Sequence, residues 1–279
     1  MLSVEEIQNM SYTDFIALIR ETNRCPGGKD TIRQIVQNSF VGSESKILEV
    51  GSNTGFTSLE LAHITKSSIW GIDVSKSCVE IANELLSNDI ESVRNRVKFK
   101  VGSAYDIPFE NDMFDLVVTG GATSFMDKKQ KAVSEYKRVL KPWGFLSVTQ
   151  LFYAKNPPAS VVNAVSEAIG VKINAWSEED WRKIFEENQD DINLELYYYK
   201  KQELQSREKK IIDDYIEYFL RKEHMVDLDE KLRETIRKKW RYYIDVFNEN
   251  HKYLGYFIAL FRKTHYPEEP ELFVRKQND

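Results

Sequence analysis

The spacing of apolar residues changes twice along the chain and divides it into three parts. Over residues 3–20 apolar side chains recur at helical spacing, which predicts one amphipathic helix. From Lys46 to Leu151 short apolar runs alternate with helical stretches, and the runs predict strands at 47–50, 68–73, 97–101, 114–118 and 145–151. Because a crossover helix lies on a face of the sheet, this alternation predicts a parallel, doubly wound α/β fold.

Beyond residue 151 the alternation loosens into a mainly helical third part. The pattern predicts helices near 159–169, 177–188, 206–225 and 229–248, with strands at 192–199 and 253–261. In the last helix a stripe of apolar residues recurs every three or four positions, which indicates a buried face: Leu228, Leu232, Ile236, Trp240, Tyr243 and Phe247.

Composition narrows the class of protein. The 279 residues carry a formal net charge of −5 and 42% hydrophobic residues, which is an ordinary globular mixture. The acidic balance argues against a nucleic-acid partner, and the basic run 237–241 contains Trp240 of the buried stripe, which favours a solvated helix face. Two cysteines and the absence of an apolar run approaching 18 residues predict a cytoplasmic protein without membrane insertion.

The clearest chemical signal is the glycine-rich turn at residues 47–56, where a buried strand runs into a helix. Glycines let the backbone approach a ligand closely, and the helix that follows points its amino terminus at that ligand. A dinucleotide fingerprint would need glycine at Asn53 and Phe56, and no Gly-Lys-Ser/Thr follows for a phosphate-binding loop. A plain strand-to-helix turn remains the alternative.

Asp73 supplies a second signal at the end of the second strand. A carboxylate about 20 residues past the glycine turn can accept hydrogen bonds from ribose hydroxyls. Its alternative role is to cap the helix that begins there. The two signals together are more specific than either alone.

Four blocks in order carry a family resemblance: residues 48–55, 71–75, 102–109 and 138–146. On these blocks the chain resembles the class I S-adenosylmethionine-dependent methyltransferases, close to the branch of the ubiquinone/menaquinone-biosynthesis enzymes and other small-molecule methyltransferases. The resemblance implies a Rossmann-like sheet of seven strands with the last antiparallel, and S-adenosyl-L-methionine as cofactor.

The resemblance also implies a set of cofactor-binding residues. Gly51, Asn53 and Gly55 would surround the methionine part, with Glu49 in the same strand and turn. Asp73 would hold the ribose and Val74 would lie against the adenine. The adenine edge would meet Ser103, where the family often has an acidic residue, and Ala104. The last two implied positions, Thr119 and Gly120, would face the sulfonium.

No catalytic residue can be assigned from the sequence. Of the histidines, His63 and His265 are interpreted as structural or solvated, whereas His224 and His251 are candidates to face the pocket. None has metal-ligand spacing, so no metal is expected. The cluster from Arg24 to Lys29 opens a helix and could bind a carboxylate of the cofactor or of the substrate, or simply form a turn.

These observations predict methyl transfer by in-line displacement to a small molecule, at oxygen, nitrogen or an activated carbon. The alternatives are a methyltransferase acting on a peptide or protein terminus, and a non-catalytic protein that binds S-adenosylmethionine. A homodimer is compatible with the sequence.

The chain is longer than such a fold needs, which predicts added helical parts. We expect an N-terminal helical cap at 1–40, a core at 41–205 and 249–279, and a helical lid at 206–248 inserted between the sixth and seventh strands. The lid would select the substrate because ligands bind at that edge of the sheet. Aromatic residues would line it or join its helices: Tyr215, Tyr218, Phe219, Tyr242 and Tyr243.

Overall fold

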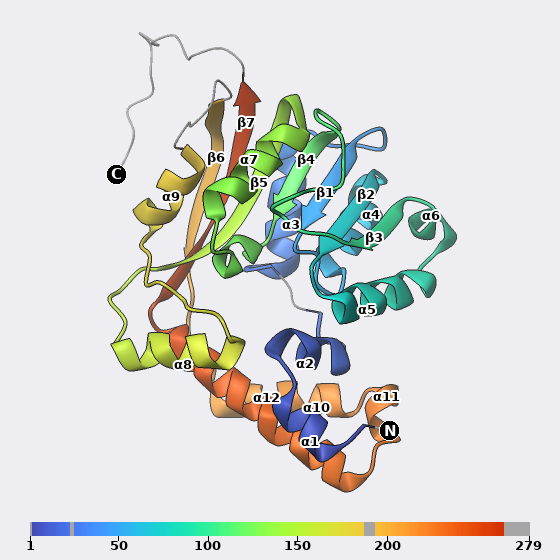
Figure 1. Cartoon of the computed structure of the whole chain (residues 1–279), viewed down its shortest axis with the longest axis vertical. Coiled ribbons are helices and arrows are strands. Elements are labelled where there is room, and N and C mark those ends of the chain that lie inside the picture. Colours follow the sequence, from blue (N-terminus) through green and yellow to red (C-terminus); the bar gives the residue numbers. More distant parts are fainter. Residues whose placement is uncertain (1, 23–24, 187–192, 265–279) are drawn as a thin grey trace.

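The computed structural model describes residues 2–22, 25–186 and 193–264, and a twisted seven-stranded sheet lies at its centre (Figure 1). The strands lie in the order β3-β2-β1-β4-β5-β7-β6, and β7 runs antiparallel to both of its neighbours. This arrangement confirms the predicted fold. The strands are β1 Lys46–Val50, β2 Ser68–Asp73, β3 Val97–Val101, β4 Phe114–Thr119, β5 Leu140–Tyr153, β6 Asn193–Glu203 and β7 Leu254–Thr264.

Each face of the sheet carries its own hydrophobic core. One core packs under α3 Gly28–Ser39, α4 Phe56–Thr65, α5 Lys76–Ser87 and α6 Glu91–Arg94. The other packs under α7 Lys129–Val139 and α9 Glu178–Glu186, and the short 3₁₀ helix η1 Ala122–Phe125 follows β4. The central strands have runs of apolar residues in the sequence because helices cover both of their faces.

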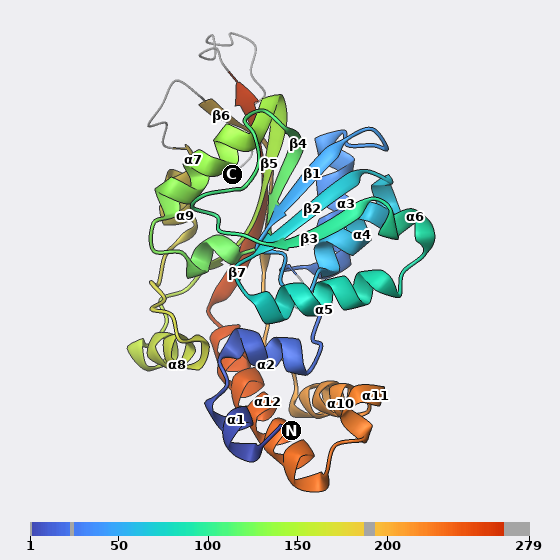
Figure 2. The same ribbon diagram turned by 45° about the vertical axis from the view of Figure 1, so that its right-hand side comes forward.

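A third hydrophobic core lies outside the sheet, in a layer of helices below the carboxyl ends of the parallel strands (Figure 2). We call this layer the cap; it consists of α1 Val4–Asn9, α2 Tyr12–Leu18, α8 Ala159–Ile169, α10 Lys209–Leu220, α11 Glu223–Val226 and α12 Glu230–Asn250. It joins the amino terminus to the segment between β6 and β7, whereas α3 packs on the sheet. No described helix is long and apolar enough to cross a membrane.

Two predicted helices are in fact interrupted. The expected helix at 3–20 is two helices, because Met10 is extended and the Ser11 hydroxyl accepts a hydrogen bond from the backbone N–H of Asp14, which starts α2. The expected helix at 206–225 ends at Leu220, and the extended Lys222 precedes α11. Apolar spacing alone does not report such breaks, since both pieces face the same core.

The fifth strand is longer than the predicted 145–151. Residues 141–144, expected as a loop, continue β5, with the pairing to β4 shifting between Phe114 and Leu116. Trp143 has a positive φ of 65° at this irregularity, and the Arg262 guanidinium lies 4.8 Å from its ring centre. A bulge of this kind lets a strand pass residues that sequence patterns assign to a turn.

Candidate functional site

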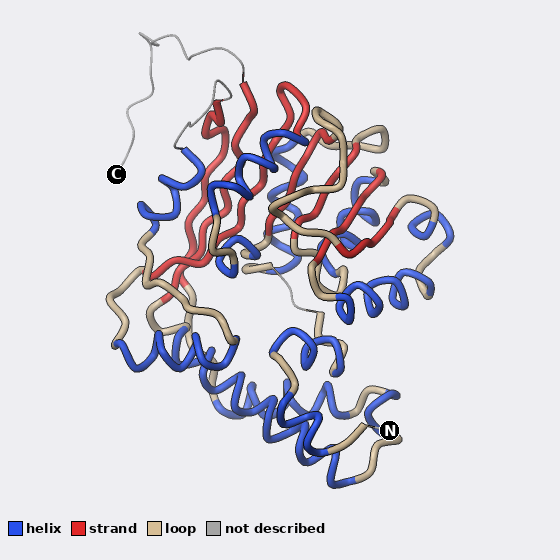
Figure 3. The backbone as a smooth tube through the Cα atoms, in the orientation of Figure 1, coloured by secondary structure: helices blue, strands red, loops and turns tan. Residues whose placement is uncertain are grey.

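A cavity of about 1420 Å³ separates the sheet edge from the cap, which stands below the strands in Figure 3. Its sheet side consists of residues that follow β1, β2, β3 and β4, and its cap side comes from α8, α10 and α12. The carboxyl edge of a parallel sheet is where ligands of such folds bind.

The glycine turn after β1 brings backbone to the cavity wall. Gly51 has a φ of 79°, and a Cβ built on it would lie 2.3 Å from the Cβ of Ala122, so a side chain cannot be placed there. Asn53 also has a positive φ and lines the cavity. The neighbouring hydroxyl of Ser52 is buried and has no hydrogen-bond partner among the described residues. The turn therefore offers a close-approach surface and a free polar atom.

Asp73 is fixed in place by two backbone groups. One carboxylate oxygen accepts from the N–H of Asn53 at 2.9 Å and the other from the N–H of Ser75 at 2.9 Å. The helix cap itself is Ser75, whose hydroxyl accepts from the N–H of Cys78. The carboxylate joins the glycine turn to the next loop and lines the cavity.

Glu49 is a buried acid beside these groups. Its Oε2 accepts from the Ser58 hydroxyl at 2.5 Å and from the Ser58 N–H at 3.0 Å. Burial raises the pKa of Glu49 to about 7, although the hydrogen bonds from Ser58 oppose the shift. A negative charge at this position therefore forms only near neutral pH, unless a cation approaches it.

The structure brings most of the implied cofactor-binding residues together. Those that line the cavity are Glu49, Gly51, Asn53, Asp73, Val74, Ser103, Ala104 and Gly120. Gly55 and Thr119 do not line it. Gly55 packs against Phe99, where an added Cβ would lie 2.7 Å from the ring, and the Thr119 hydroxyl lies 3.2 Å from that of Thr123 in the interior.

The histidines separate clearly by position. His63 pairs with Asp89 at 3.0 Å on the surface, and His224 lies outside the cavity lining. His251 lines the cavity, and burial followed by the charge of Arg207 lowers its pKa. His265 lies outside the described residues. Across the described ranges, no cluster of His, Cys, Asp and Glu could hold a metal ion.

The turn before α3 also reaches the cavity, through residues 25–28. Gly27 adopts a φ of 79°, and a Cβ there would lie 2.5 Å from the Tyr256 hydroxyl. Lys29 instead pairs with Glu60 at 2.5 Å, and Arg24 lies outside the described residues. Burial raises the pKa of Cys25 to about 12, so this thiol stays protonated.

The aromatic residues of the cap divide between lining the cavity and holding the helices together. Tyr215 lines the cavity. Phe219 lies against Trp240, and Tyr243 packs on Phe15, so both serve the cap core. Tyr218 and Tyr242 are exposed.

Two polar residues at the end of the cavity nearest the cap, Tyr153 and Asn250, were not predicted from the sequence; they neighbour His251, which was. Tyr153 lies beyond the predicted end of the fifth strand, and since residues 144–150 are all buried, no alternation along the strand marks its position.

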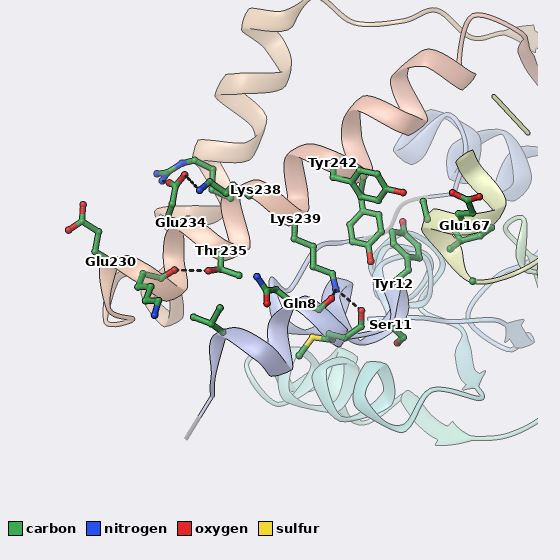
Figure 4. Close-up of a pocket in the computed structure, with 18 residues that line it drawn as sticks. Gln8, Ser11, Tyr12, Glu167, Glu230, Glu234, Thr235, Lys238, Lys239 and Tyr242 are labelled. Carbon is green, nitrogen blue, oxygen red and sulfur yellow. Dashed lines mark hydrogen bonds and ion pairs between the residues drawn. The ribbon is translucent and has the colours of Figure 1, made fainter. Parts of the chain in front are cut away.

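A second hollow on the outside of the cap contrasts with the cavity (Figure 4). It is an open groove between α1, α8 and α12, lined by many charged residues. Lys239 donates to the carbonyls of Ile7, Gln8 and Met10, at 2.7–2.8 Å, and Arg237 pairs with Glu217 and Glu234. These cations already serve the fold, so the groove does not resemble a binding site.

Comparisons with known proteins agree with this geometry. Residues 48–148 match the family described as "Methyltransferase domain". The methyltransferase YcgJ of Bacillus subtilis is 31% identical over 56% of this chain and 60% of its own length. The ubiquinone/menaquinone biosynthesis C-methyltransferase UbiE of Geotalea daltonii is 37% identical over 36% of this chain and 42% of its own length. The chain thus spans less than two thirds of either relative.

The fold of this chain is similar to that of MccD protein, whose crystal structure superposes with a TM-score of 0.71 and 24% sequence identity. The superposition covers 87% of this chain and 100% of the MccD chain. At this identity the likeness concerns the fold alone. Three observations indicate the same family: the strand order, the glycine turn held by Asp73, and the match of residues 48–148. Over residues 48–148 the chain is therefore similar to the class I S-adenosylmethionine-dependent methyltransferases, and its sheet has the strand order of that fold.

Proposed function

We propose that this protein transfers the methyl group of S-adenosylmethionine to a small-molecule acceptor held between the sheet edge and the cap. The observation that carries the proposal is the cavity, because one continuous space joins the glycine turn and Asp73 to the helices of the cap. A cofactor at the sheet side would leave the cap side for an acceptor.

The residues at the sheet side suit the cofactor. The bare backbone at Gly51 and the unpartnered Ser52 hydroxyl are what a closely bound methionine part needs. Asp73 has lone pairs left after accepting from two N–H groups and would hold the ribose. Val74, which is 72% exposed, would lie against the adenine, with Ser103 and Ala104 at its edge. Gly120 would lie toward the sulfonium, and Glu49 would offset positive charge.

When bound, S-adenosylmethionine supplies an electrophilic methyl group. The protein's own task is to align the acceptor and exclude water, and alignment contributes about 7–11 kcal/mol in favourable cases. The cap suits this task because it covers the cavity with apolar side chains of α10 and α12.

A small-molecule acceptor is favoured by the same cover. A pocket that lies between two layers takes a compact ligand more readily than a protein surface. The name of the UbiE relative, a C-methyltransferase of quinone biosynthesis, points to the same class of acceptor. A peptide or protein terminus is the second candidate, since a chain end could also enter such a cavity.

Isothermal titration with S-adenosylmethionine and S-adenosylhomocysteine tests the cofactor. We expect both to bind, and Asp73→Ala to weaken binding at least about 100-fold, because two charge-assisted hydrogen bonds are worth about 1.5–3 kcal/mol each. Asp89→Ala is the matched control, since Asp89 contacts His63 on the surface. Failure of either ligand to bind the wild-type protein would refute the proposal.

Methyl-labelled cofactor then tests the acceptor class. The protein is incubated with a cell extract divided into low-molecular-weight and macromolecular fractions. We expect label in the first fraction only. Label confined to the second fraction would favour the peptide-terminus alternative.

A further inference from the structure

The cap end of the cavity contains buried polar atoms that the fold leaves without partners. Tyr153 is 9% exposed and Asn250 is 7% exposed, and both line the cavity. The Asn250 Oδ1 has no hydrogen-bond partner among the described residues, and the only group that the Tyr153 hydroxyl meets there is the side chain of Asn250. Buried polar groups are nearly always paired, so this pair calls for a ligand or a water.

The two residues meet where the sheet joins the cap. Tyr153 is the last residue of β5 and lies opposite Leu254, the first residue of β7. Asn250 is the last residue of α12, and its carbonyl accepts from the N–H of Tyr253 at 3.0 Å. The adjacent His251 also lines the cavity. The pairing of β5 with β7 thus holds the backbone of Tyr153, and the turn after α12 holds that of Asn250, so the polar atoms of both residues are fixed in place.

The group is far from the cofactor side. Val148 of β5 lies opposite Thr119 at the end of β4, and Tyr153 is five residues further along β5. At the rise of a β-strand this is about 16 Å. The space along the way has a mainly apolar wall, formed by Leu151, Val165, Ile169, Ile212, Phe247 and Leu254.

The surroundings favour an uncharged ligand group. Tyr153 and Asn250 are neutral, and the lowered pKa of His251 keeps its imidazole neutral at neutral pH. The charged residues of the cavity on the cap side, Lys172, Glu203 and Arg207, are exposed, so water screens their charges, although the charge of Arg207 reaches His251. A buried ion would find no opposite charge among the three inner residues, and burying an unpaired ion is strongly unfavourable.

We propose that Tyr153, Asn250 and His251 form a subsite that binds an uncharged hydroxyl or amide group at the end of an elongated, mostly apolar acceptor, remote from the atom that is methylated. The proposal rests on the proposed function, which places the cofactor at the opposite side of the cavity. It assigns to these residues the selection of acceptors by a distal polar group.

Calorimetric titration of two probes tests the subsite: 1-decanol, with an uncharged end, and decanoate, with a charged one. Each is titrated into the full-length protein with and without S-adenosylhomocysteine. We expect 1-decanol to bind at least tenfold more tightly than decanoate. The double variant Tyr153→Phe/Asn250→Leu should lose at least tenfold in affinity for 1-decanol while its affinity for S-adenosylhomocysteine is unchanged.

Tyr198→Phe is the matched control, because its hydroxyl lies outside the cavity and donates to Gln34 at 3.0 Å. It should leave 1-decanol binding unchanged. If the double variant does not fold, as judged by its thermal melt, the single variant Tyr153→Phe carries the test with a threshold of threefold.

Three outcomes would overturn the subsite: no binding of 1-decanol, equal binding of both probes, or equal binding of 1-decanol by wild type and variant. The last would mean that the polar atoms are satisfied by water only. If S-adenosylhomocysteine does not bind the wild-type protein, the proposed function fails, and the titrations without it still decide the subsite.

Discussion

The sheet and the cap meet at one cavity, yet they are built on different principles. In the sheet, neighbouring strands pair by backbone hydrogen bonds, and the groups at the cavity are held by short local contacts, as Asp73 is by Asn53 and Ser75. In the cap, segments from opposite ends of the chain are joined by side chains, as Phe15 and Trp240 are. From this comparison we predict that the proposed cofactor and acceptor sites can be altered separately.

Trp240→Ala should have the largest effect on the cap. Trp240 is 3% exposed and lies among Phe15, Tyr215 and Phe219. Loss of a buried tryptophan side chain costs about 3–5 kcal/mol. We expect faster amide exchange in α10 and α12, loss of methyl transfer, and cofactor affinity within about threefold of wild type, since local opening need not spread to the sheet.

The matched control for that variant is Phe257→Ala in the sheet, where Phe257 is fully buried and stacks on Phe152. It should increase exchange in the strands instead. If Trp240→Ala abolished cofactor binding as well, the separation of cap and sheet would be wrong.

The sheet and the cap also differ in how much of their structure the sequence predicts. The strands and the glycine turn were predictable because burial on two faces produces apolar runs, and because Gly51 needs a positive φ. The cap core was not, since it depends on contacts such as Phe15 with Trp240, and periodicity reports which face is buried but not against what. Asp73 was found by spacing, whereas Tyr153 and Asn250 come together only through folding.

Tyr215→Phe should have an intermediate effect at the joint between the two regions. The Tyr215 hydroxyl donates to the Glu21 carboxylate at 2.8 Å, and the Glu21 carbonyl accepts from the Thr54 hydroxyl in the glycine turn. Removing a donor to a buried charged group costs about 1.5–3 kcal/mol. Urea unfolding should show this loss.

Tyr218→Phe serves as the control for that change, because Tyr218 is 64% exposed. It should leave the urea midpoint unchanged. Equal midpoints for Tyr215→Phe and wild type would show that this link contributes nothing to holding the cap.

The titration of Glu49 should have a smaller effect, on the affinity for the cofactor. Because its pKa is raised to about 7, Glu49 is mostly protonated at pH 6 and mostly ionised at pH 8. A cationic cofactor favours the ionised form, so its affinity should rise as pH increases toward 7 and level off above it, by up to about tenfold per pH unit below the pKa.

Stability of the free protein should change in the opposite direction. The folded state retains a proton on Glu49 between pH 4.5, its ordinary pKa, and about 7, so this group's contribution to stability falls as pH rises through that range. Glu49→Gln should flatten both profiles, as measured by calorimetric titration and thermal melting. Unchanged profiles in the variant would assign the titration to another group.

The smallest effect should come from the groove on the outside of the cap. Lys238 lies 3.7 Å from Glu234, and its side chain is 77% exposed, so Lys238→Ala should change the free energy of unfolding by less than about 0.5 kcal/mol. Methyl transfer should be unaffected. The physical reason is that the cations of the groove which contact the fold, such as Lys239, are already paired with carbonyls, whereas the cavity leaves polar atoms free. A clear loss of activity in Lys238→Ala would mean that unpaired buried polar atoms are a poor guide to where this protein binds its acceptor.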